Sequence, residues 1–283
     1  MELDTFEIEL DGATLTGVEL GEGVPVVFLH AGVCDHRMWQ EQMETLAEAG
    51  FHAIAYDRRG FGETVSEDVP FNHLEDLEEL LDAMDIYAAV FVGASMGGGL
   101  ALDFALAHPG RVLGLVLAGT SVTGAPYEIL DSEMPLIMAE EDADERGDLD
   151  MLNKVHAHAW LDGPGSASGR VGGAARALFL EMNAKALAMP ALTQDEERPS
   201  AYERVKAVTA PGLLVVGDLD FNYIQGRHEY LSEEMPNVFA AVLEGVAHLP
   251  NLERPDLFDP LLLEFLDALF GEDGIADGEE ADA

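Results

Sequence analysis

The chain has 283 residues, of which 55 are acidic and 14 are Lys or Arg, so its formal net charge at pH 7 is −41. A surface this acidic repels phosphate backbones, which excludes nucleic acid as a partner. The length suits one large domain, or a core with an inserted segment. The N-terminus lacks a basic start followed by an apolar run, and no stretch has the ~18 apolar residues of a membrane span. We therefore expect a cytoplasmic protein with no membrane partner.

The negative charge is spread along the whole chain. Residues 272–283 carry six acidic side chains, so most of the net charge lies elsewhere. We expect this polar tail to be disordered. A dense carboxylate shell with only three lysines is typical of proteins that work at molar salt, where screening suppresses self-repulsion. The alternative is that the acidic side chains only keep the protein soluble at ordinary salt concentrations.

The first elements are a hairpin followed by alternating strands and helices. Residues 5–10 and 14–20 alternate apolar and polar side chains around Asp11-Gly12, which predicts an antiparallel hairpin. Several later strands are continuous apolar runs, which is typical of a parallel sheet buried on both faces. The strands are predicted at 24–30, 51–57, 88–93 and 111–118, and the helices at 39–48, 73–84 and 96–107.

This alternation breaks after Gly119. Residues 121–201 contain helical patterns at 129–141, 149–161 and 172–189 and no clear strand. Strands at 212–217 and 238–243, with helices at 223–234 and 257–270, then follow. The predicted fold is therefore α/β, with a mostly parallel sheet and helices on both faces. Its core spans residues 1–120 and 202–271, interrupted by a helical insertion at 121–201 and followed by a tail at 272–283.

A Gly-x-Ser-x-Gly motif lies between the strand at 88–93 and the helix at 96–107. Gly93 and Gly97 flank Ser95 at two residues' distance on either side. A serine that attacks a carbonyl must project from a sharp bend between strand and helix, and glycines remove the side chains that would collide there. We predict that Ser95 is a nucleophile.

A serine hydroxyl needs a base, and histidine takes and returns a proton near neutral pH. His248 follows the last predicted strand, at the sheet edge where parallel α/β folds place their sites. We choose His248 as the base, and His36, in the loop near Ser95, is its remaining competitor. The carboxylate that orients the base is expected after the strand at 212–217, where Asp218 and Asp220 both occur. We prefer Asp220 because it lies further past the strand end, whereas Asp218 is placed to cap the turn.

A tetrahedral intermediate also needs amide donors for its oxyanion. The turn at Ser95 offers the N–H of Met96. The loop after the first long strand offers the N–H of Gly32 or that of Val33. Cys34, the single cysteine, lies in the same loop without an activating motif and is expected to be a bystander.

Together these motifs resemble the α/β-hydrolase superfamily, from about residue 20 to about residue 270. The similarity is to the branch of enol-lactonases, small carboxylesterases and cofactor-free haloperoxidase-like esterases, and it includes the chain order Ser95, Asp220, His248. It implies the α/β-hydrolase fold, with the helical insertion as a cap over the site. One departure is that Ala31 replaces the glycine usual after His30, which leaves the second oxyanion donor open. The matching segments are Phe28 to Gly32, Tyr56 to Gly62, Gly93 to Gly97, Gly217 to Asp220 and Gly245 to His248.

We expect hydrolysis of a small or medium ester or lactone through an acyl-enzyme. Other chemistry on this fold (a C–C bond hydrolase, a lyase or a perhydrolase) is the first alternative, and a non-catalytic receptor the second. No phosphate loop or metal-ligand spacing occurs, so we expect no cofactor and no metal. Large apolar residues of the insertion form either a substrate pocket or the insertion's own core. They are Met134, Met138, Met151, Trp160, Phe179, Met182 and Met189.

Overall fold

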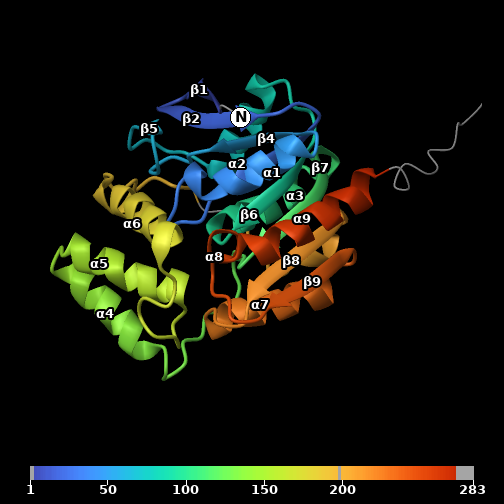
Figure 1. The fold of residues 1–283 in the computed structure, drawn as a ribbon. Coiled ribbons are helices and arrows are strands. Elements are labelled where there is room, and N and C mark those ends of the chain that lie inside the picture. The colour runs from blue at the N-terminus through green and yellow to red at the C-terminus, as the bar shows by residue number, and fades with distance from the viewer. Residues whose placement is uncertain (1–2, 197–198, 272–283) are drawn as a thin grey trace, which may run out of the picture.

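The computed structural model describes residues 3–196 and 199–271, so the predicted tail at 272–283 lies outside the described residues. Its centre is a sheet with the strand order β1-β2-β4-β3-β6-β7-β8-β9, in which β5 pairs with β2 (Figure 1). The strands are β1 (Asp4–Leu10), β2 (Ala13–Leu20), β3 (Val24–Leu29), β4 (Phe51–Tyr56), β5 (Val65–Ser66), β6 (Ala89–Ala94), β7 (Val112–Ala118), β8 (Gly212–Gly217) and β9 (Val238–Leu243).

The sheet combines an antiparallel start with a parallel centre. Strands β1 and β2 form the predicted hairpin, and Gly12 at its turn has φ 69°, a left-handed conformation that favours glycine. Strand β2 is also antiparallel to β4, and the pairs from β4 through β3, β6, β7 and β8 to β9 are parallel. The carboxyl ends of the parallel strands therefore meet at one edge. The predicted fold class is confirmed.

Helices cover both faces of the sheet. Helices α1 (Gln40–Glu48) and α9 (Pro255–Phe270) share one apolar cluster with the strand residues Phe28, Val92 and Val215. On the other face α2 (His73–Ala83), α3 (Met96–Ala107) and α7 (Asn222–Glu234) pack on the alternate strand residues. Among the helices of the described residues, none combines the length and hydrophobicity that a membrane span requires. Short helical turns complete the core: η1 (His36–Trp39), η2 (Pro109–Arg111), η4 (Val205–Ala207) and α8 (Pro250–Glu253).

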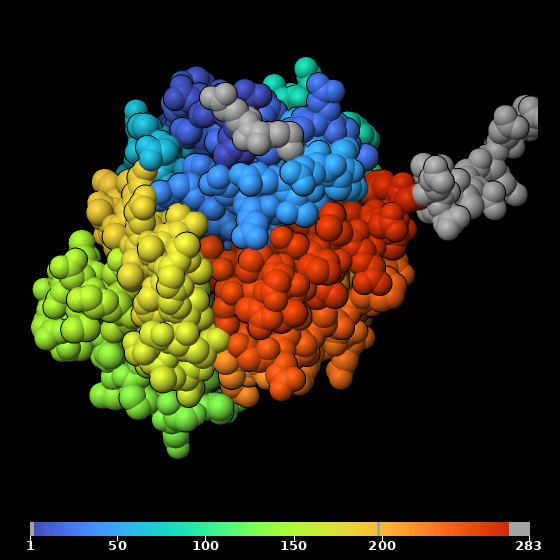
Figure 2. Space-filling model, viewed as in Figure 1, coloured from blue at the N-terminus to red at the C-terminus, as the bar shows by residue number. Residues whose placement is uncertain are grey.

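The predicted insertion between β7 and β8 contains α4 (Met134–Glu145), α5 (Leu149–His156), the π-helical turn η3 (Ala157–Asp162) and α6 (Gly173–Ala188). These elements lie together at the left of Figure 1. In the space-filling view α6, in yellow, lies against the blue N-terminal part and the red C-terminal helices (Figure 2).

Three helix boundaries predicted in this segment were wrong, and one of them is the end of α4, which lies at Glu145 and not at residue 141. Helix α4 begins at Met134 and not at residue 129, because Pro135 has no N–H and is accommodated in a first turn. The helix expected at 149–161 is regular only to His156, and its last turn is π-helical.

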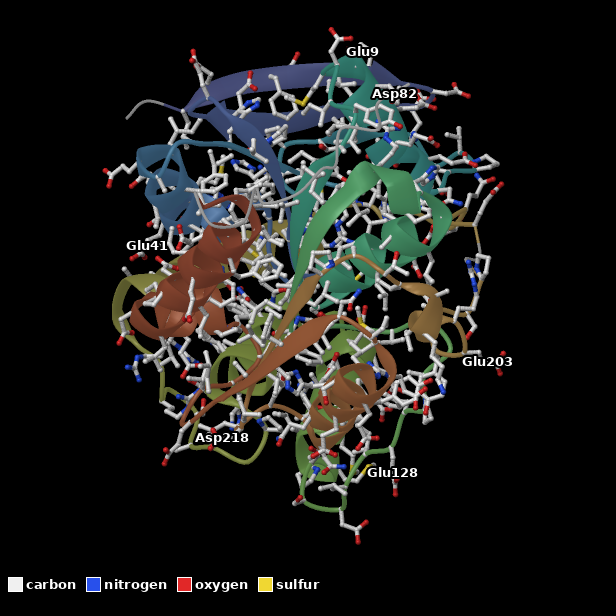
Figure 3. The ribbon with its side chains drawn as sticks, turned by 90° about the vertical axis from the view of Figure 1, so that its right-hand side faces the viewer. Glu9, Glu41, Asp82, Glu128, Glu203 and Asp218 are labelled. Carbon is white, nitrogen blue, oxygen red and sulfur yellow. The ribbon has the colours of Figure 1, made fainter. Side chains whose placement is uncertain are left out.

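The acidic shell surrounds the molecule. Exposed carboxylates labelled in Figure 3 come from strands, helices and loops on different sides: Glu9, Glu41, Asp82, Glu128, Glu203 and Asp218.

Raising KCl from 0.1 M to 2 M shrinks the Debye length from ~10 Å to below ~3 Å. Because this screens the repulsion between the carboxylates, it should raise the thermal unfolding temperature of the protein. The measurement is a melting curve followed by circular dichroism. Sucrose at equal osmolarity is the control for general solvent effects. An unfolding temperature that falls or stays constant in KCl would contradict the salt hypothesis.

Candidate active site

Ser95 lies at the bend between the carboxyl end of β6 and the start of α3. Its backbone has φ 52° and ψ −117°, a conformation that L-residues rarely adopt. The bend is held by hydrogen bonds: the Ser95 N–H donates to the Ala118 carbonyl at 2.9 Å, and the Ser95 carbonyl accepts the Ser121 N–H at 3.1 Å. Neighbouring structure therefore keeps Ser95 strained and its side chain at the sheet edge.

The close approach predicted at the two flanking glycines is confirmed. A Cβ on Gly97 would lie 2.0 Å from the Leu29 carbonyl oxygen, and one on Gly93 would lie 2.5 Å from the Gly97 carbonyl oxygen. Both contacts are with backbone, which cannot move aside cheaply. The glycines therefore allow α3 to begin directly against β6 and β3.

His248 and Asp220 form a buried pair. The Nδ1 atom of His248 lies 2.7 Å from Oδ2 of Asp220, and the exposed fractions of the two side chains are 1% and 0%. The other oxygen of Asp220 accepts the Phe221 N–H at 2.7 Å. With Nδ1–H donated to the carboxylate, Nε2 of the ring is left as a proton acceptor.

Asp218, the alternative acid, has a different environment. It is exposed, and its Oδ1 accepts the N–H of Gly245 at 2.6 Å. This bond ties the end of β8 to the turn after β9, as expected of a residue that caps a turn. The structure therefore brings Asp220, and not Asp218, to His248.

The His248 pair lies at the same sheet edge as Ser95. Ser95 follows β6, Asp220 follows β8 and His248 follows β9, and these strands are parallel. A contact also connects the two sites. Gly119 adjoins Ala118, the residue bonded to Ser95, and a Cβ on Gly119 would lie 2.9 Å from Nδ1 of His248.

Two loops that supply candidate oxyanion donors touch each other. A Cβ on Gly32 would lie 2.4 Å from the sulfur of Met96, so Gly32 packs directly on the residue after Ser95. The Cys34 N–H donates to the Ala31 carbonyl at 3.2 Å, which forms a turn with Gly32 and Val33 at its centre. Within the described residues, the backbone N–H groups of Gly32, Val33 and Met96 make no backbone hydrogen bond. Gly32 and Val33 both remain candidates.

His36 belongs to a separate pair. Its Nδ1 lies 2.9 Å from Oδ1 of Asp57, and Oδ2 of Asp57 accepts the Glu63 N–H at 2.7 Å. Burial alone would raise the pKa of Asp57, but hydrogen bonds and charge from His36, with charge from His30, lower it to about 2. Asp35 lies close by, and the guanidinium of Arg37 binds both of its carboxylate oxygens. These contacts clamp the loop after β3 to the loop after β4, a structural role.

His30 is fully buried at the end of β3. Its Nδ1 lies 2.7 Å from the Ala31 carbonyl oxygen, and its Nε2 accepts the N–H of Arg58 at 3.1 Å. Burial, and next the charge of Arg58, lower the pKa of His30 to about 3. Both ring nitrogens are occupied, so His30 shapes the Gly32 loop and has no free acceptor for a serine proton.

Comparison with known proteins identifies the family. The model of the alpha/beta hydrolase family matches residues 26–260. The chain belongs to this family. It is 24% identical over 249 residues to 3-oxoadipate enol-lactonase 1 of Acinetobacter baylyi, a match that covers 86% of this chain and 89% of that protein.

Other family members match in part or in fold. The non-heme chloroperoxidase of Kitasatospora aureofaciens is 32% identical over 136 residues, which is 43% of this chain and 50% of that relative's length. A thermophilic esterase from Thermogutta terrifontis has a TM-score of 0.76 at 23% identity, covering 94% of this chain and 99% of the esterase chain. This last likeness shows the fold alone.

In this family member a cleft of about 410 Å³ opens beside Gly32. It lies between the loops after β3 and β4 and the C-terminal part of α6. Its lining is both apolar and polar and includes Gly32, Phe61, His73, His156, Asn183 and Met189. His156 and Asn183 are within hydrogen-bond distance of each other. The cleft therefore offers an incoming molecule polar groups as well as apolar contacts.

The seven large apolar residues of the insertion have different positions. Met134, Met138 and Met151 are exposed, and Phe179 and Met182 are fully buried in the core. Met189 lines the cleft, and Trp160 packs on His248. The seven residues do not form one pocket together, because three are exposed, two are buried in the core and only Met189 lines the cleft. Sequence reasoning had no pattern that could pair Trp160 with His248.

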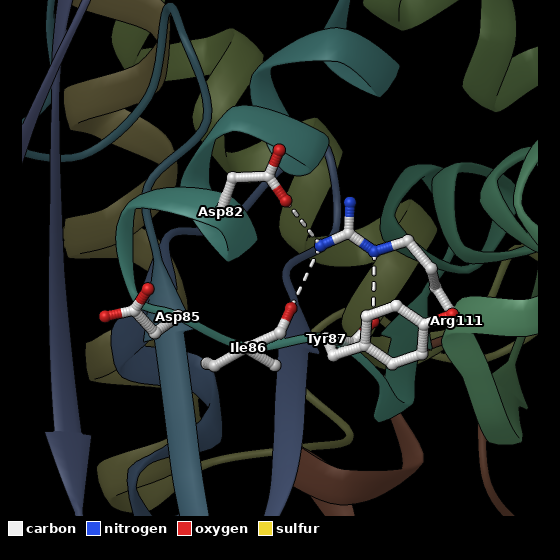
Figure 4. Close-up of a pocket in the computed structure, with 5 residues that line it drawn as sticks. All are labelled: Asp82, Asp85, Ile86, Tyr87 and Arg111. Atoms are coloured by element: carbon white, nitrogen blue, oxygen red, sulfur yellow. Dashed lines mark hydrogen bonds and ion pairs between the residues drawn. The ribbon is translucent and has the colours of Figure 1, made fainter.

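A second cavity of about 360 Å³ lies at the opposite end of the hydrolase sheet (Figure 4). Its lining residues precede β6 and β7, at the amino ends of these strands. The guanidinium of Arg111 is bound there by Asp82 and by the carbonyls of Ile86 and Tyr87, at 2.7 to 3.0 Å. This arginine joins α2 to β7 and is structural.

Proposed function

We propose that the protein is a serine hydrolase that cleaves a small or medium carboxylic ester or lactone through an acyl-enzyme intermediate. The observation that carries the proposal is the 2.7 Å contact between His248 Nδ1 and Asp220 Oδ2 at the sheet edge that holds Ser95. Nε2 of His248 takes the proton of Ser95 as Oγ attacks the carbonyl carbon. Asp220 holds the ring in the required tautomer and stabilises the imidazolium.

The remaining groups complete the cycle. The N–H of Met96 and that of Gly32 donate to the oxyanion of the tetrahedral intermediate. His248 then gives its proton to the leaving oxygen, and the C–O bond breaks. A water molecule, deprotonated by His248, attacks the acyl-enzyme and releases the acid and Ser95. The similarity to an enol-lactonase supports a cyclic ester as one form of substrate.

We assign residues 121–201 the role of a cap over this edge. Helix α6 lines the cleft beside Gly32, and η3 places Trp160 on His248. The cleft is the binding region for the acyl or leaving group. Because polar as well as apolar side chains line it, the proposed substrates include esters and lactones that carry a hydrogen-bonding group.

The test is a panel of p-nitrophenyl esters and five- and six-membered lactones, run beside labelling with a fluorophosphonate. We expect saturable turnover and a single phosphonylated residue, Ser95, identified by peptide mass spectrometry. Prior incubation with the fluorophosphonate should abolish turnover. Labelling of another residue, or no hydrolysis with any ester or lactone, would contradict the proposal. Peracid formation from acetate and hydrogen peroxide, without ester hydrolysis, would favour the alternative chemistry.

A further inference from the structure

The indole of Trp160 lies against the ring of His248. The ring centroids are 4.7 Å apart with planes at 49°, and a second contact joins Trp160 to Phe221, the residue after Asp220, at 4.8 Å. One side chain of the insertion therefore touches both the proposed base and the neighbour of its carboxylate. Because His248 and Asp220 are almost fully buried, the indole is part of what separates their hydrogen bond from water.

The backbone that carries Trp160 is unusual. Trp160 lies in the π-helical turn η3, and such turns are rare and are frequently found at functional sites. The turn ends at Asp162, a fully buried carboxylate that binds the guanidinium of Arg176 at 2.9 Å and the N–H groups of Gly169 and Val171. These bonds fix the end of the turn and so fix the place of the indole.

The segment after the turn also packs on the two catalytic loops. Gly163 has φ 93°, and a Cβ there would lie 2.5 Å from the Leu219 carbonyl oxygen and 3.4 Å from the Cβ of Ala247. Leu219 precedes Asp220, and Ala247 precedes His248. This segment therefore packs on the residues that directly precede Asp220 and His248, while the indole of Trp160 packs on His248 and Phe221.

We propose that Trp160 is a positioning residue for His248. Its indole holds the imidazole in the orientation that bonds Asp220, excludes water from that bond and stabilises the protonated ring through the face of its π system. This inference rests on the proposed role of His248 as base. It gives the insertion a part in the chemistry beyond covering the substrate, because displacing η3 would release the base.

Within the described residues, several ionisable groups belong to the elements packed around His248. The carboxylate of Asp220 binds Nδ1 of the ring. The ring of Tyr223, on α7, packs against that of Phe221. Glu253 accepts the Ala247 N–H at 2.8 Å and is paired with Arg170. Since Glu253 is paired with Arg170, Asp220 and the indole are the groups that contact the His248 ring directly.

The first test uses fluorescence and needs no substrate. The chain has two tryptophans, and Trp39 is buried in the core against Phe28 and Phe258. The fluorescence of Trp160→Phe therefore comes from Trp39 alone and is the background signal. We expect the emission of the wild-type protein to fall as acidification charges His248, with a single midpoint. Trp160→Phe and His248→Gln should both lack this step. A step of unchanged size in His248→Gln would overturn the proposal.

The second test is the pH dependence of p-nitrophenyl acetate hydrolysis. Trp160→Leu keeps an apolar side chain but removes the π face, so the acidic limb of kcat/KM should shift down by about half a pH unit. We expect kcat to fall about tenfold while KM changes less than about twofold, and Trp160→Phe to recover most of kcat. An unchanged acidic limb and kcat in Trp160→Leu would overturn the proposal. Thermal unfolding of each variant shows whether the fold is retained.

The two tests separate this inference from the proposed function. If no ester or lactone is hydrolysed, the proposed function fails, and the fluorescence titration still reports the contact between Trp160 and His248. If Trp160→Leu does not fold, the comparison of the wild-type protein with His248→Gln remains decisive. If the protein hydrolyses an ester or lactone but its fluorescence shows no step that depends on His248, the proposed function stands and the proposed role of Trp160 is wrong.

Discussion

Replacing Ser95 with alanine is expected to lower kcat for p-nitrophenyl acetate by roughly 10⁴ to 10⁶-fold, because the variant lacks the hydroxyl that accepts the acyl group in the proposed mechanism. Ser95→Gly should be equally inactive and yet more stable than the wild-type protein, by about 1 kcal/mol. The reason is the strained backbone, with φ 52° and ψ −117°, which glycine adopts with little cost. Initial rates and thermal unfolding of the two variants measure both effects.

Ser121→Ala is the matched control for this pair. Ser121 is the nearby serine whose Oγ donates to the Ser95 carbonyl at 3.2 Å, so its removal also perturbs the bend. We expect it to retain activity within about tenfold of the wild-type protein. Activity that persists in Ser95→Ala but disappears in Ser121→Ala would reassign the nucleophile. A Ser95→Gly protein less stable than Ser95→Ala would show that the bend is not strained.

The parts of the fold that follow from local chemistry were predictable. Strands β8 and β9 and helix α3 begin and end at the predicted residues, since each is a continuous periodic segment bounded by turn residues. The glycines around Ser95 indicated the close approach of helix and strand before any distance was known. These features depend on residues that are neighbours in sequence.

Features that depend on distant contacts were missed. Strand β5 has two residues and exists because Val65 and Ser66 pair with β2. Helix α8 has four residues, too few to produce a periodic pattern. The π turn η3 is held by hydrogen bonds from Val171 and Arg176 to the buried carboxylate of Asp162. Because these donors lie outside the turn, the sequence of the turn itself cannot be distinguished from that of an ordinary helix. In contrast, Pro135 was a visible sign of the true start of α4.

The same division applies to the site. The order of Ser95, Asp220 and His248 placed each residue after a strand, and parallel strands bring such positions to one edge. The choice between Asp218 and Asp220 depended on which carboxylate reaches across to His248, a question of loop geometry. In the structure Asp220 is buried against His248, and Asp218 is exposed and bonded to Gly245.

Asp220→Asn is expected to reduce kcat/KM by about 10⁴-fold, while Asp218→Asn should stay within about tenfold of the wild-type value. The two variants change the net charge equally, so they form a matched pair. The asparagine at 220 can still accept the Phe221 N–H through its oxygen, which leaves its NH₂ group facing Nδ1 of His248. Nδ1 must then accept a hydrogen bond, and the ring proton moves to Nε2.

A ring protonated at Nε2 cannot take the proton of Ser95, so the loss arises from the wrong tautomer and not from a missing contact. An asparagine at 218 keeps an oxygen that accepts the Gly245 N–H, so the turn and the tautomer are both preserved. Initial rates with p-nitrophenyl acetate at pH 8 and thermal unfolding of both variants make the comparison. A greater loss in Asp218→Asn, with both proteins folded, would reverse the assignment of the acid. Equal small losses would mean that neither carboxylate sets the tautomer of the base.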